Sequence, residues 1–283
     1  MTRGRQVDWT RNSRPMQEGA GVLVHRAIGH EDTNRLDPFL MLDDFGSTRK
    51  EGYEAGFPSH PHRGFETVTY MLKGEMEHRD STGRSGIIGP GDVQWMTAGS
   101  GIIHEEMPRM KGGELRGLQL WANLPAKKKM TEPTYRGYEK KSIPVVKTSG
   151  GAEVRVIAGT VSGERGPVRD VAIDPEYLDI SMNPDTEFRH DVPEEHTAFA
   201  YVLEGEAEFD DSGETASARV LVVFESGEQI VVRTKGEPVR FIFVAGKPLK
   251  EPVAWRGSVV MNTQEELRQA YQEVRAGTFV KQH

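Results

Sequence analysis

The hydrophobic positions of this chain fall into short runs that alternate with turn residues. Residues 21–26 and 67–72 are β-prone runs, and each predicts a strand. Residues 36–45 form a longer apolar stretch that ends in a turn, and we expect it to line or cover the mouth of a barrel. Residues 7–9 could add a strand to an otherwise irregular beginning. Because long helical patterns are few and glycine, at 31 residues, is frequent, the sequence predicts an all-β fold.

One helical pattern lies beyond residue 260. Thr263 and Glu266 form a capping box, in which each side chain bonds to the backbone N–H of the other residue. One apolar helical face follows, at Leu267, Ala270, Tyr271 and Val274. Gly277 suits the position just after the helix. We expect this short helix to pack on a barrel and to carry no chemistry.

An internal repeat indicates two barrels. Residues 70–77 (YMLKGEME) match residues 201–208 (YVLEGEAE), and each copy has the pattern of a strand, a glycine turn and a second strand. Downstream, we match Gly91-Asp92 to Gly227-Glu228. Two copies of one β unit predict two similar jelly-roll barrels packed together.

The repeat divides the chain near residue 132. We expect residues 1–132 to form the N-terminal barrel and residues 133–283 the C-terminal barrel. The segment 125–144 is rich in Lys, Pro and Tyr without a clear period, so it predicts the connection between them. Within it, Lys127–Lys129 are expected to be solvated rather than to contact nucleic acid, because the chain is acidic overall.

Charge and cysteine content narrow the classes of function. A formal net charge of -7 argues against a nucleic-acid surface, which needs a basic stripe. The chain has no cysteine, which excludes disulfides, iron–sulfur clusters and thiol catalysis and fits a reducing cytosol. Residues 1–19 are polar, and no stretch is apolar enough to span a membrane. We expect a cytoplasmic monomer without direct contact to nucleic acid or membrane.

Two histidine motifs carry the candidate chemistry. The first spans His60–His62 (HPH) and the second spans His104–Glu106 (HEE). Side chains in a strand alternate between faces, so residues two apart share one face. If the two strands face each other inside a barrel, three imidazoles and a carboxylate converge. Such a set of ligands suits a divalent transition metal, most naturally iron.

The sequence around these motifs carries a family resemblance. Residues 60–68 (HPHRGFETV), 90–99 (PGDVQWMTAG) and 102–108 (IIHEEMP) resemble a pirin, a branch of the cupin superfamily. The similarity extends over about residues 36–124 and returns at residues 251–253 and 260–263. The resemblance implies a double cupin with iron in the N-terminal barrel only. It also implies the metal ligands, which are His60, His62, His104 and Glu106.

Two glutamates compete for the fourth ligand position. In general cupins a glutamate follows the histidine pair by three or four residues, which is Glu66 here. Glu106 lies two residues after His104 and on the same strand face, and periodicity alone does not separate the two candidates. The pirin resemblance selects Glu106. Glu66 is then expected to accept a proton from a ligand histidine and so to fix its tautomer.

The second copy of the repeat is expected to lack these ligands. Counting from the matched tyrosines places Asp191 and Pro193 opposite His60 and His62. Counting from the matched glycines places Arg240 and Ile242 opposite His104 and Glu106. We therefore expect no metal of this kind in the C-terminal barrel.

The expected site fits several metals. Three imidazoles and one carboxylate suit Fe(II), with Mn, Co, Ni, Cu and Zn as alternatives. Four protein ligands leave about two positions of an octahedron open, which a chelating substrate and dioxygen could occupy. The walls of the pocket are expected to include Phe57, Met76 and the mouth residue Asp43. Arg63 should point away from the site, because it directly follows His62 in the strand.

The resemblance implies an iron-dependent dioxygenase with an activity like that of quercetin 2,3-dioxygenase. Its partners would be a flavonol-type aromatic enol and O2, with release of carbon monoxide, and Glu106 would be both ligand and base. The alternative is a metal-binding protein without turnover that acts on a protein partner, as animal pirins do with transcription regulators. A deep apolar cavity above the metal favours the enzyme, and a shallow or plugged one favours the binding protein.

Overall fold

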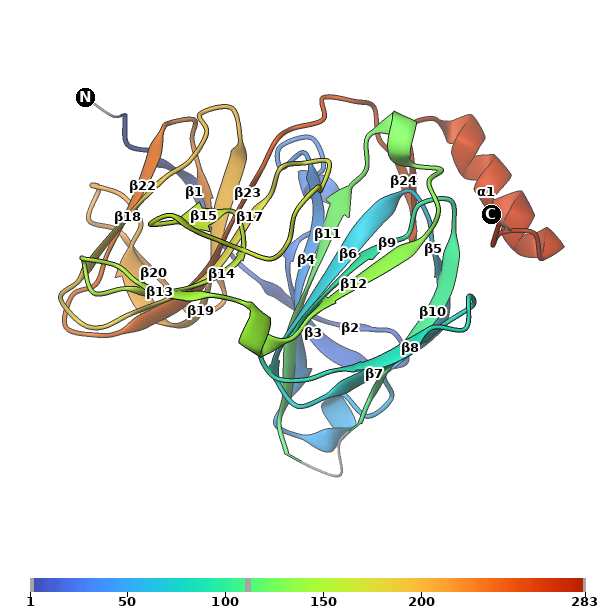
Figure 1. Ribbon diagram of the computed structural model, residues 1–283, viewed down its shortest axis with the longest axis horizontal. Helices are drawn as coiled ribbons and strands as arrows, with labels where there is room; N and C mark the ends of the chain where they lie inside the picture. The colour runs from blue at the N-terminus through green and yellow to red at the C-terminus, as the bar shows by residue number, and fades with distance from the viewer. Residues whose placement is uncertain (1–2, 110–112, 282–283) are drawn as a thin grey trace. The chain divides into compact units, whose positions relative to one another are not determined.

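The computed structural model describes residues 3–109 and 113–281 of the chain (Figure 1). The expectation of an all-β chain with two jelly-roll barrels and a short C-terminal helix is confirmed. Residues Arg14–Lys140, together with the chain from Leu249 onward, form one compact unit, which we call the histidine unit. Residues Lys141–Pro248, together with the chain up to Ser13, form the second unit.

This division differs from the expected single boundary at residue 132. The N-terminal segment belongs to the unit formed by the second half of the chain, and the C-terminal segment belongs to the unit formed by the first half. The strand expected at residues 7–9 is β1 (Val7–Asn12), and it pairs with β21 (Val220–Phe224) in the second unit. The segment after Pro248 returns to the histidine unit. A local pattern predicts that a strand forms, whereas its partner, more than 200 positions away, is chosen by tertiary packing.

The histidine unit is built on a seven-stranded antiparallel sheet. The order of its strands is β12 (Thr134–Tyr138), β9 (Val93–Thr97), β6 (Phe65–Lys73), β11 (Leu115–Asn123), β4 (Phe39–Ser47), β3 (Val22–Ile28) and β2 (Arg14–Glu18). The stretch expected at residues 36–45 thus forms β4, in the interior of this sheet, and its first seven residues are buried.

A smaller sheet of four strands completes the histidine unit. Its strands, in order, are β5 (Phe57–His62), β10 (Ile102–Pro108), β7 (Met76–Asp80) and β8 (Ser85–Ile88). Figure 1 shows β5, β10, β8 and β7 along one side of this unit. Side chains of β10 and β5 contact side chains of β6 and β11, so the two sheets face each other across the interior.

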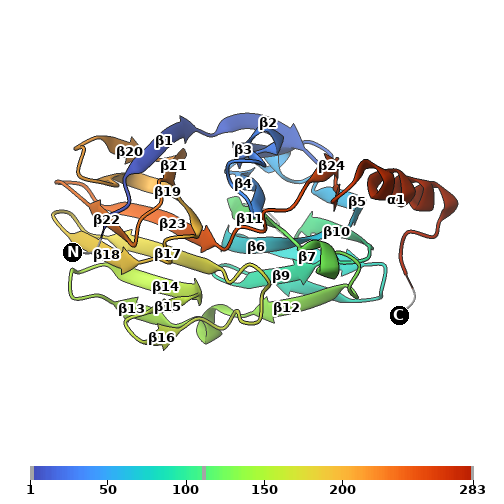
Figure 2. The ribbon, with the colours of Figure 1, turned by 90° about the horizontal axis from the view of Figure 1, so that it is seen from above.

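The chain after Pro248 closes the histidine unit. It forms β24 (Ala254–Arg256), β25 (Val259–Met261) and the helix α1 (Gln264–Ala276), which packs against both strands (Figure 2). Gly64, in the turn after β5, has φ +86, and a Cβ there would lie 1.9 Å from the carbonyl oxygen of Val260. A side chain at this position would push the returning segment away, so glycine is needed for the close approach.

The helix has the predicted ends. Thr263 Oγ1 accepts from the N–H of Glu266, and a Glu266 carboxylate oxygen accepts from the N–H of Thr263. Gly277 follows with φ 70. Arg63, directly before the tight turn, donates to the carbonyl of Phe279 at 2.8 Å and pairs with Glu273 at 2.7 Å. Arg63 therefore helps to hold the segment around α1.

The segment expected to be an exposed connection, residues 125–144, is largely part of the histidine unit. Its strand β12 pairs with β9. Lys129, expected to be solvated, is only 1% exposed. Its Nζ donates to the carbonyls of Gly64 and Val260, at 2.7 and 3.1 Å, and to Asn123 Oδ1 at 2.6 Å. The composition of residues 125–144 predicted an exposed connection, because the burial of one lysine produces no periodic pattern in the sequence.

The second unit repeats the larger sheet strand for strand. Its order is β1, β21, β19 (Thr197–Glu208), β23 (Val239–Gly246), β17 (Glu176–Met182), β14 (Glu153–Ala158) and β13 (Val145–Lys147). Beside them lie β18 (Glu187–Asp191), β22 (Gln229–Arg233) and β20 (Thr215–Ser217). The predicted match of residues 70–77 to 201–208 is confirmed, since β6 and β19 hold the same place. In this repeat β1 takes the place of β12.

The match of Gly91 to Gly227 is wrong. Tyr70 pairs with Val93, and Tyr201 pairs with Leu221, so Gly91, two residues before Val93, corresponds to Arg219. Gly227 instead precedes β22, the counterpart of β10. Arg219 has φ 69, close to the φ of 88 at Gly91, so the turn is repeated without the glycine.

The counting of ligand positions changes accordingly. His62 pairs with Ile102 in the histidine unit, and His190 pairs with Ile230 in the second unit. By this register the second unit has His190 in place of His62, Phe188 in place of His60 and Val232 in place of His104. The residues named earlier, Asp191, Pro193, Arg240 and Ile242, are not the counterparts. The count failed because five residues separate β18 from β19, whereas two separate β5 from β6.

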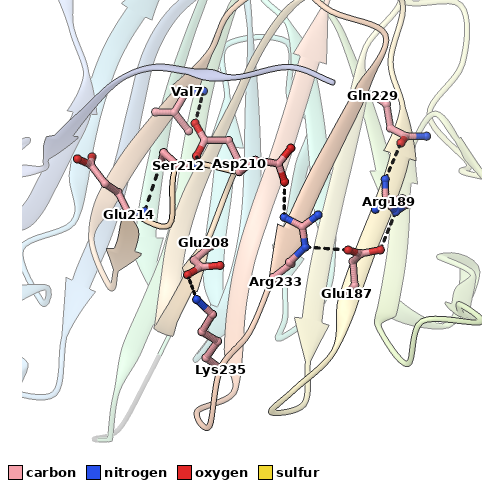
Figure 3. Close-up of polar contacts among 11 residues, drawn as sticks. Val7, Glu187, Arg189, Glu208, Asp210, Ser212, Glu214, Gln229, Arg233 and Lys235 are labelled. Atoms are coloured by element: carbon pink, nitrogen blue, oxygen red, sulfur yellow. Dashed lines mark hydrogen bonds and ion pairs between the residues drawn. The ribbon is translucent and has the colours of Figure 1, made fainter. Parts of the chain in front are cut away.

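The second unit is apolar at two of the three positions where the histidine unit has its histidines. Phe188 and Val232 belong to its core cluster. His190 Nε2 lies 2.6 Å from a carboxylate oxygen of Glu176. The register of β18 and β22 is supported by a polar contact at their ends, where Arg233 bonds to Glu187 (Figure 3).

The remaining short elements are connections. Among the described residues they are two strands, β15 (Thr160–Val161) and β16 (Glu164–Arg165), and four single-turn 3-10 helices at His30–Asp32, Lys50–Gly52, Ala126–Lys128 and Lys140–Ser142. No helix in the described part of the chain combines the length and apolar character that a bilayer crossing requires.

Candidate metal centre

Two neighbouring strands bring three histidines together. β5 carries His60 and His62, and β10 places His104 directly opposite His60. The ring centroids lie 4.6, 4.5 and 4.8 Å apart for the pairs 60–62, 60–104 and 62–104. One nitrogen from each ring lies within 4.8 Å of the others, a spacing that could hold one metal ion.

Hydrogen bonds orient two of the three rings. The Nδ1 of His60 lies 2.8 Å from the carbonyl of Pro58, an acceptor, so His60 carries its proton on Nδ1 and presents the lone pair of Nε2. The Nδ1 of His104 lies 3.4 Å from the Tyr135 hydroxyl, while its Nε2 lies 3.1 Å from Nε2 of His60. Both Nε2 atoms therefore point into the same small volume, as in metal sites whose outer nitrogens are held by protein groups.

His62 is the buried member of the triad. It is 1% exposed, and neither ring nitrogen makes a hydrogen bond of ordinary geometry among the described residues, although the nearby Ser258 backbone opposes the lowering of its pKa. Its ring meets the edges of Phe65 and Trp121, at 5.2 and 5.3 Å between centroids. A buried imidazole without a partner loses its hydration at a cost of about 1–3 kcal/mol, and a metal ion would restore a partner. The residues present thus fit a metal ligand at this place.

The electrostatics keep the rings of His62 and His104 neutral. Burial, followed by the neighbouring His60 and His104, holds the pKa of His62 well below its ordinary value. Burial and His60 lower the pKa of His104 to about 3. Neutral imidazole is the form that binds a metal, so no proton has to leave first at physiological pH.

Glu106 stands two residues after His104 on β10 and is held by two donors. Its side chain is on the same strand face as His104, and the residue is 2% exposed. One carboxylate oxygen accepts from Thr69 Oγ1 at 3.3 Å, and the other accepts from Gln119 Nε2 at 3.0 Å. The group of donor atoms within 4.8 Å of one another consists of the three histidines and does not extend to this carboxylate.

Glu66 points to the other face of the large sheet. Phe65 and Thr69, on the same strand, contact His62 and Glu106, and Glu66 is offset from both by an odd number of residues. A carboxylate oxygen of Glu66 accepts from Thr97 Oγ1 at 2.6 Å, rather than from a histidine. Burial raises the pKa of Glu66, and the Thr97 bond opposes this.

A cavity of about 540 Å³ opens at the histidines. Its wall includes His60 and His62, the apolar side chains of Met41, Phe57, Pro58, Trp121 and Trp255, and the polar residues Glu18, Arg26, Asp43, Gln119 and Ser258. Phe57 and Asp43 were expected there. Met76 was also expected but packs in the core cluster with Tyr53 and Leu115.

Several wall residues were not predicted from the sequence. Arg26 and Gln119 stand in strands whose register with β4 is set only by folding. Trp255 comes from the returning segment, and its indole N–H bonds to the carbonyl of Gly257. For Trp255, the sequence offered only the family resemblance near residues 251–263. That resemblance indicated that the segment matters but not that it lies at the cavity.

Comparison with known proteins agrees with this arrangement. The family model for pirin matches residues 21–122, and the model for the pirin C-terminal cupin domain matches residues 177–280. A pirin-like protein of Caulobacter vibrioides is 44% identical over 94% of this chain and 95% of its own length. A pirin-like protein of Solanum lycopersicum is 44% identical over 94% of this chain and 89% of its own length.

A solved structure also matches over nearly the whole chain. The crystal structure of quercetin 2,3-dioxygenase from Acinetobacter baumannii is similar with a TM-score of 0.90 and 32% identity, covering 98% of this chain and 100% of that one. The histidine triad, the repeated barrels and these matches lead to one conclusion: the chain belongs to the pirin family of the cupin superfamily.

Proposed function

We propose that this protein is a metal-dependent dioxygenase that cleaves flavonol-type enols with O2. Fe(II) is the proposed metal, and its proposed ligands are His60, His62, His104 and Glu106. The observation that carries the proposal is the cavity of about 540 Å³ with two of the three histidines in its wall. The similarity to the A. baumannii quercetin 2,3-dioxygenase adds support.

The residues of the site divide the work between them. The bound metal would supply Lewis-acid activation of the chelating enol and a site for dioxygen. His60 and His104, oriented by Pro58 and Tyr135, present their Nε2 lone pairs. The aromatic side chains of Phe57, Trp121 and Trp255 give the cavity an apolar wall that keeps water from the reacting atoms.

Glu106 is the proposed base as well as the fourth ligand. The enol must lose its proton, and Glu106 is the carboxylate beside the triad on the face of β10 that carries His104. Thr69 and Gln119 each donate to one of its oxygens, which fixes the plane of the carboxylate. A base fixed in this way is aligned before the substrate enters.

The test combines metal analysis with measurements of both gases. Purified protein is loaded with Fe(II) without oxygen and then mixed with quercetin and O2, and O2 uptake and carbon monoxide release are recorded. We expect one iron per chain and one carbon monoxide per O2 consumed. His60→Ala should lose both iron and turnover. A parent that binds one iron but consumes no more O2 than the variant would overturn the proposal and leave the metal-binding interaction protein.

A further inference from the structure

A row of four polar side chains crosses the cavity face of the large sheet. Thr69 on β6 pairs with Gln119 on β11, Gln119 pairs with Asp43 on β4, and Asp43 pairs with Arg26 on β3. Directly paired residues share a face, and neighbouring strands lie about 4.8 Å apart, so the row spans roughly 14 Å. Thr69 and Gln119 bond to Glu106, so the row begins at the metal centre.

The neighbouring row on the same face is apolar. Trp121 and Met41 pair with each other two residues along from Gln119 and Asp43, and both line the cavity. Phe57 and Trp255 add further aromatic wall. The cavity therefore has a polar edge along this row and an apolar wall of aromatic side chains and Met41 beside it, which suits a flat aromatic molecule with polar groups along one edge.

The far end of the polar row carries a net negative charge. Arg26 donates to both oxygens of Asp43, at 2.9 and 2.7 Å, and also pairs with Glu18 at 2.8 Å. Two carboxylates thus face one guanidinium, and the guanidinium is already bound to both. The single positive charge of Arg26 is thus already outweighed by the two carboxylates, and each carboxylate oxygen has a second lone pair for a donor.

Resting on the proposed function, we infer that Asp43, with Glu18 and Arg26, determines the charge of the ligand that this cavity accepts. The accepted class is an uncharged aromatic chelator with phenolic hydroxyls that donate to Asp43. Chelators that carry a carboxylate on the outer ring are rejected, because their charge meets the net negative end of the row in a partly buried site.

The test measures binding and does not depend on turnover. The protein is loaded with Zn(II), and ligand binding is followed by quenching of tryptophan fluorescence. The probes are quercetin and a 3-hydroxyflavone that carries a carboxylate on the phenyl ring; both chelate the metal in the same way. We expect the parent to bind quercetin at least about tenfold more tightly than the carboxylated probe.

Two variants and one matched control locate the effect. In Asp43→Asn the preference for quercetin should fall at least about fivefold, because one negative charge is removed and Arg26 is released. Glu18 is more exposed, and Glu18→Gln should shift the preference in the same direction by less. The control is Asp44→Asn: Asp44 makes a similar two-bond pair with Arg116 but points to the opposite face of β4. The control should leave the preference within about twofold of the parent.

Each outcome decides one of the two ideas. Equal binding of both probes by the parent would overturn the inference. So would a shift in Asp43→Asn no larger than in Asp44→Asn, or, if Asp43→Asn does not fold, no shift in Glu18→Gln. Selective binding together with a failure of O2 uptake in the iron-loaded parent would sink the proposed dioxygenase while leaving the selectivity of the cavity in place.

Discussion

At the scale of single residues, strand alternation separates the two glutamates that compete beside the histidines. Glu106 shares its face with His104 and bonds to Thr69 and Gln119. Glu66 points away and bonds to Thr97. The sequence could not decide between them from periodicity, because both lie near a histidine in an extended run. The two glutamates are separated only by the fold, because one face of the large sheet meets the small sheet that carries the histidines and Glu66 lies on the opposite face.

This geometry predicts that two matched variants differ in their affinity for the metal. Glu106→Gln should weaken metal binding at least about tenfold, because the amide is a poorer ligand and a poorer acceptor for Thr69 and Gln119. Glu66→Gln makes the same change on the opposite face and should alter the affinity by less than about twofold. Metal titration of both variants beside the parent measures this. A larger loss in Glu66→Gln would assign the site to the general cupin pattern.

Lys129 is a second residue whose environment makes a testable difference. Burial lowers its pKa to about 7, well below its ordinary value of 10.5. Between these two values the unfolded chain binds more protons than the folded one, so the contribution of this group to stability rises with pH. The sign would be reversed for a lysine whose partners raised its pKa.

Lys129→Met therefore tests the buried amine. The variant leaves the carbonyls of Gly64 and Val260 without this donor, and we expect a loss of about 2 kcal/mol in the free energy of unfolding at pH 9. The loss should be smaller at pH 7, where burying the protonated amine is costly in the parent. Urea unfolding at both values measures it. If the loss of stability is smaller at pH 9 than at pH 7, the three hydrogen-bond acceptors raise the pKa of Lys129 more than burial lowers it, and the prediction is wrong.

At the scale of elements, what is local in sequence was predictable. The capping box, the apolar face and the final glycine of α1 are all close together in the chain, and the structure has them in the predicted places. The repeat around Tyr70 and Tyr201 was equally visible. The counterparts of the ligands were missed because loop lengths differ between the copies, and residue counting carries that difference forward.

The cap of α1 gives a prediction at this scale. Thr263→Ala removes the acceptor for the N–H of Glu266 and should cost about 1 kcal/mol of stability. Thr278→Ala is the control, since Thr278 makes its bonds to Glu273 and Lys281 through its backbone. Thermal unfolding of both variants compares them. Equal melting temperatures would mean that the cap contributes nothing beyond the loss of a methyl group and a hydroxyl.

At the scale of the whole molecule, the two ends of the chain exchange units. The N-terminal segment up to Ser13 belongs to the second unit, and the C-terminal segment from Leu249 belongs to the histidine unit. The strand pattern at residues 7–9 was visible in the sequence, but its partner β21 was not. The polar row from Thr69 to Arg26 was invisible for the same reason, since its four members come from four strands. Register between distant strands is decided by the packing of complete faces.

Two deletions should therefore act on opposite units. Removing the chain up to Asn12 takes β1 from the second unit and should leave one metal per chain in the histidine unit. Removing the chain from Leu249 onward takes Trp255 and the acceptor of Arg63 from the histidine unit, and metal binding should be lost. Metal content of the purified chains provides the measurement. The assignment of the segments fails if the first deletion removes the metal and the second retains it.

The return of the final segment has a consequence for how the protein is made. The chain is synthesised from its N-terminus at about 5–20 residues per second, so its N-terminal part emerges from the ribosome first. His60, His62 and His104 leave it long before Trp255, Ser258 and Phe279, on which the cavity wall and the Arg63 contact depend. The histidines therefore spend many seconds in a nascent chain whose pocket is still open on one side. A metal taken up in that interval would be selected by cellular availability rather than by the shape of the finished site.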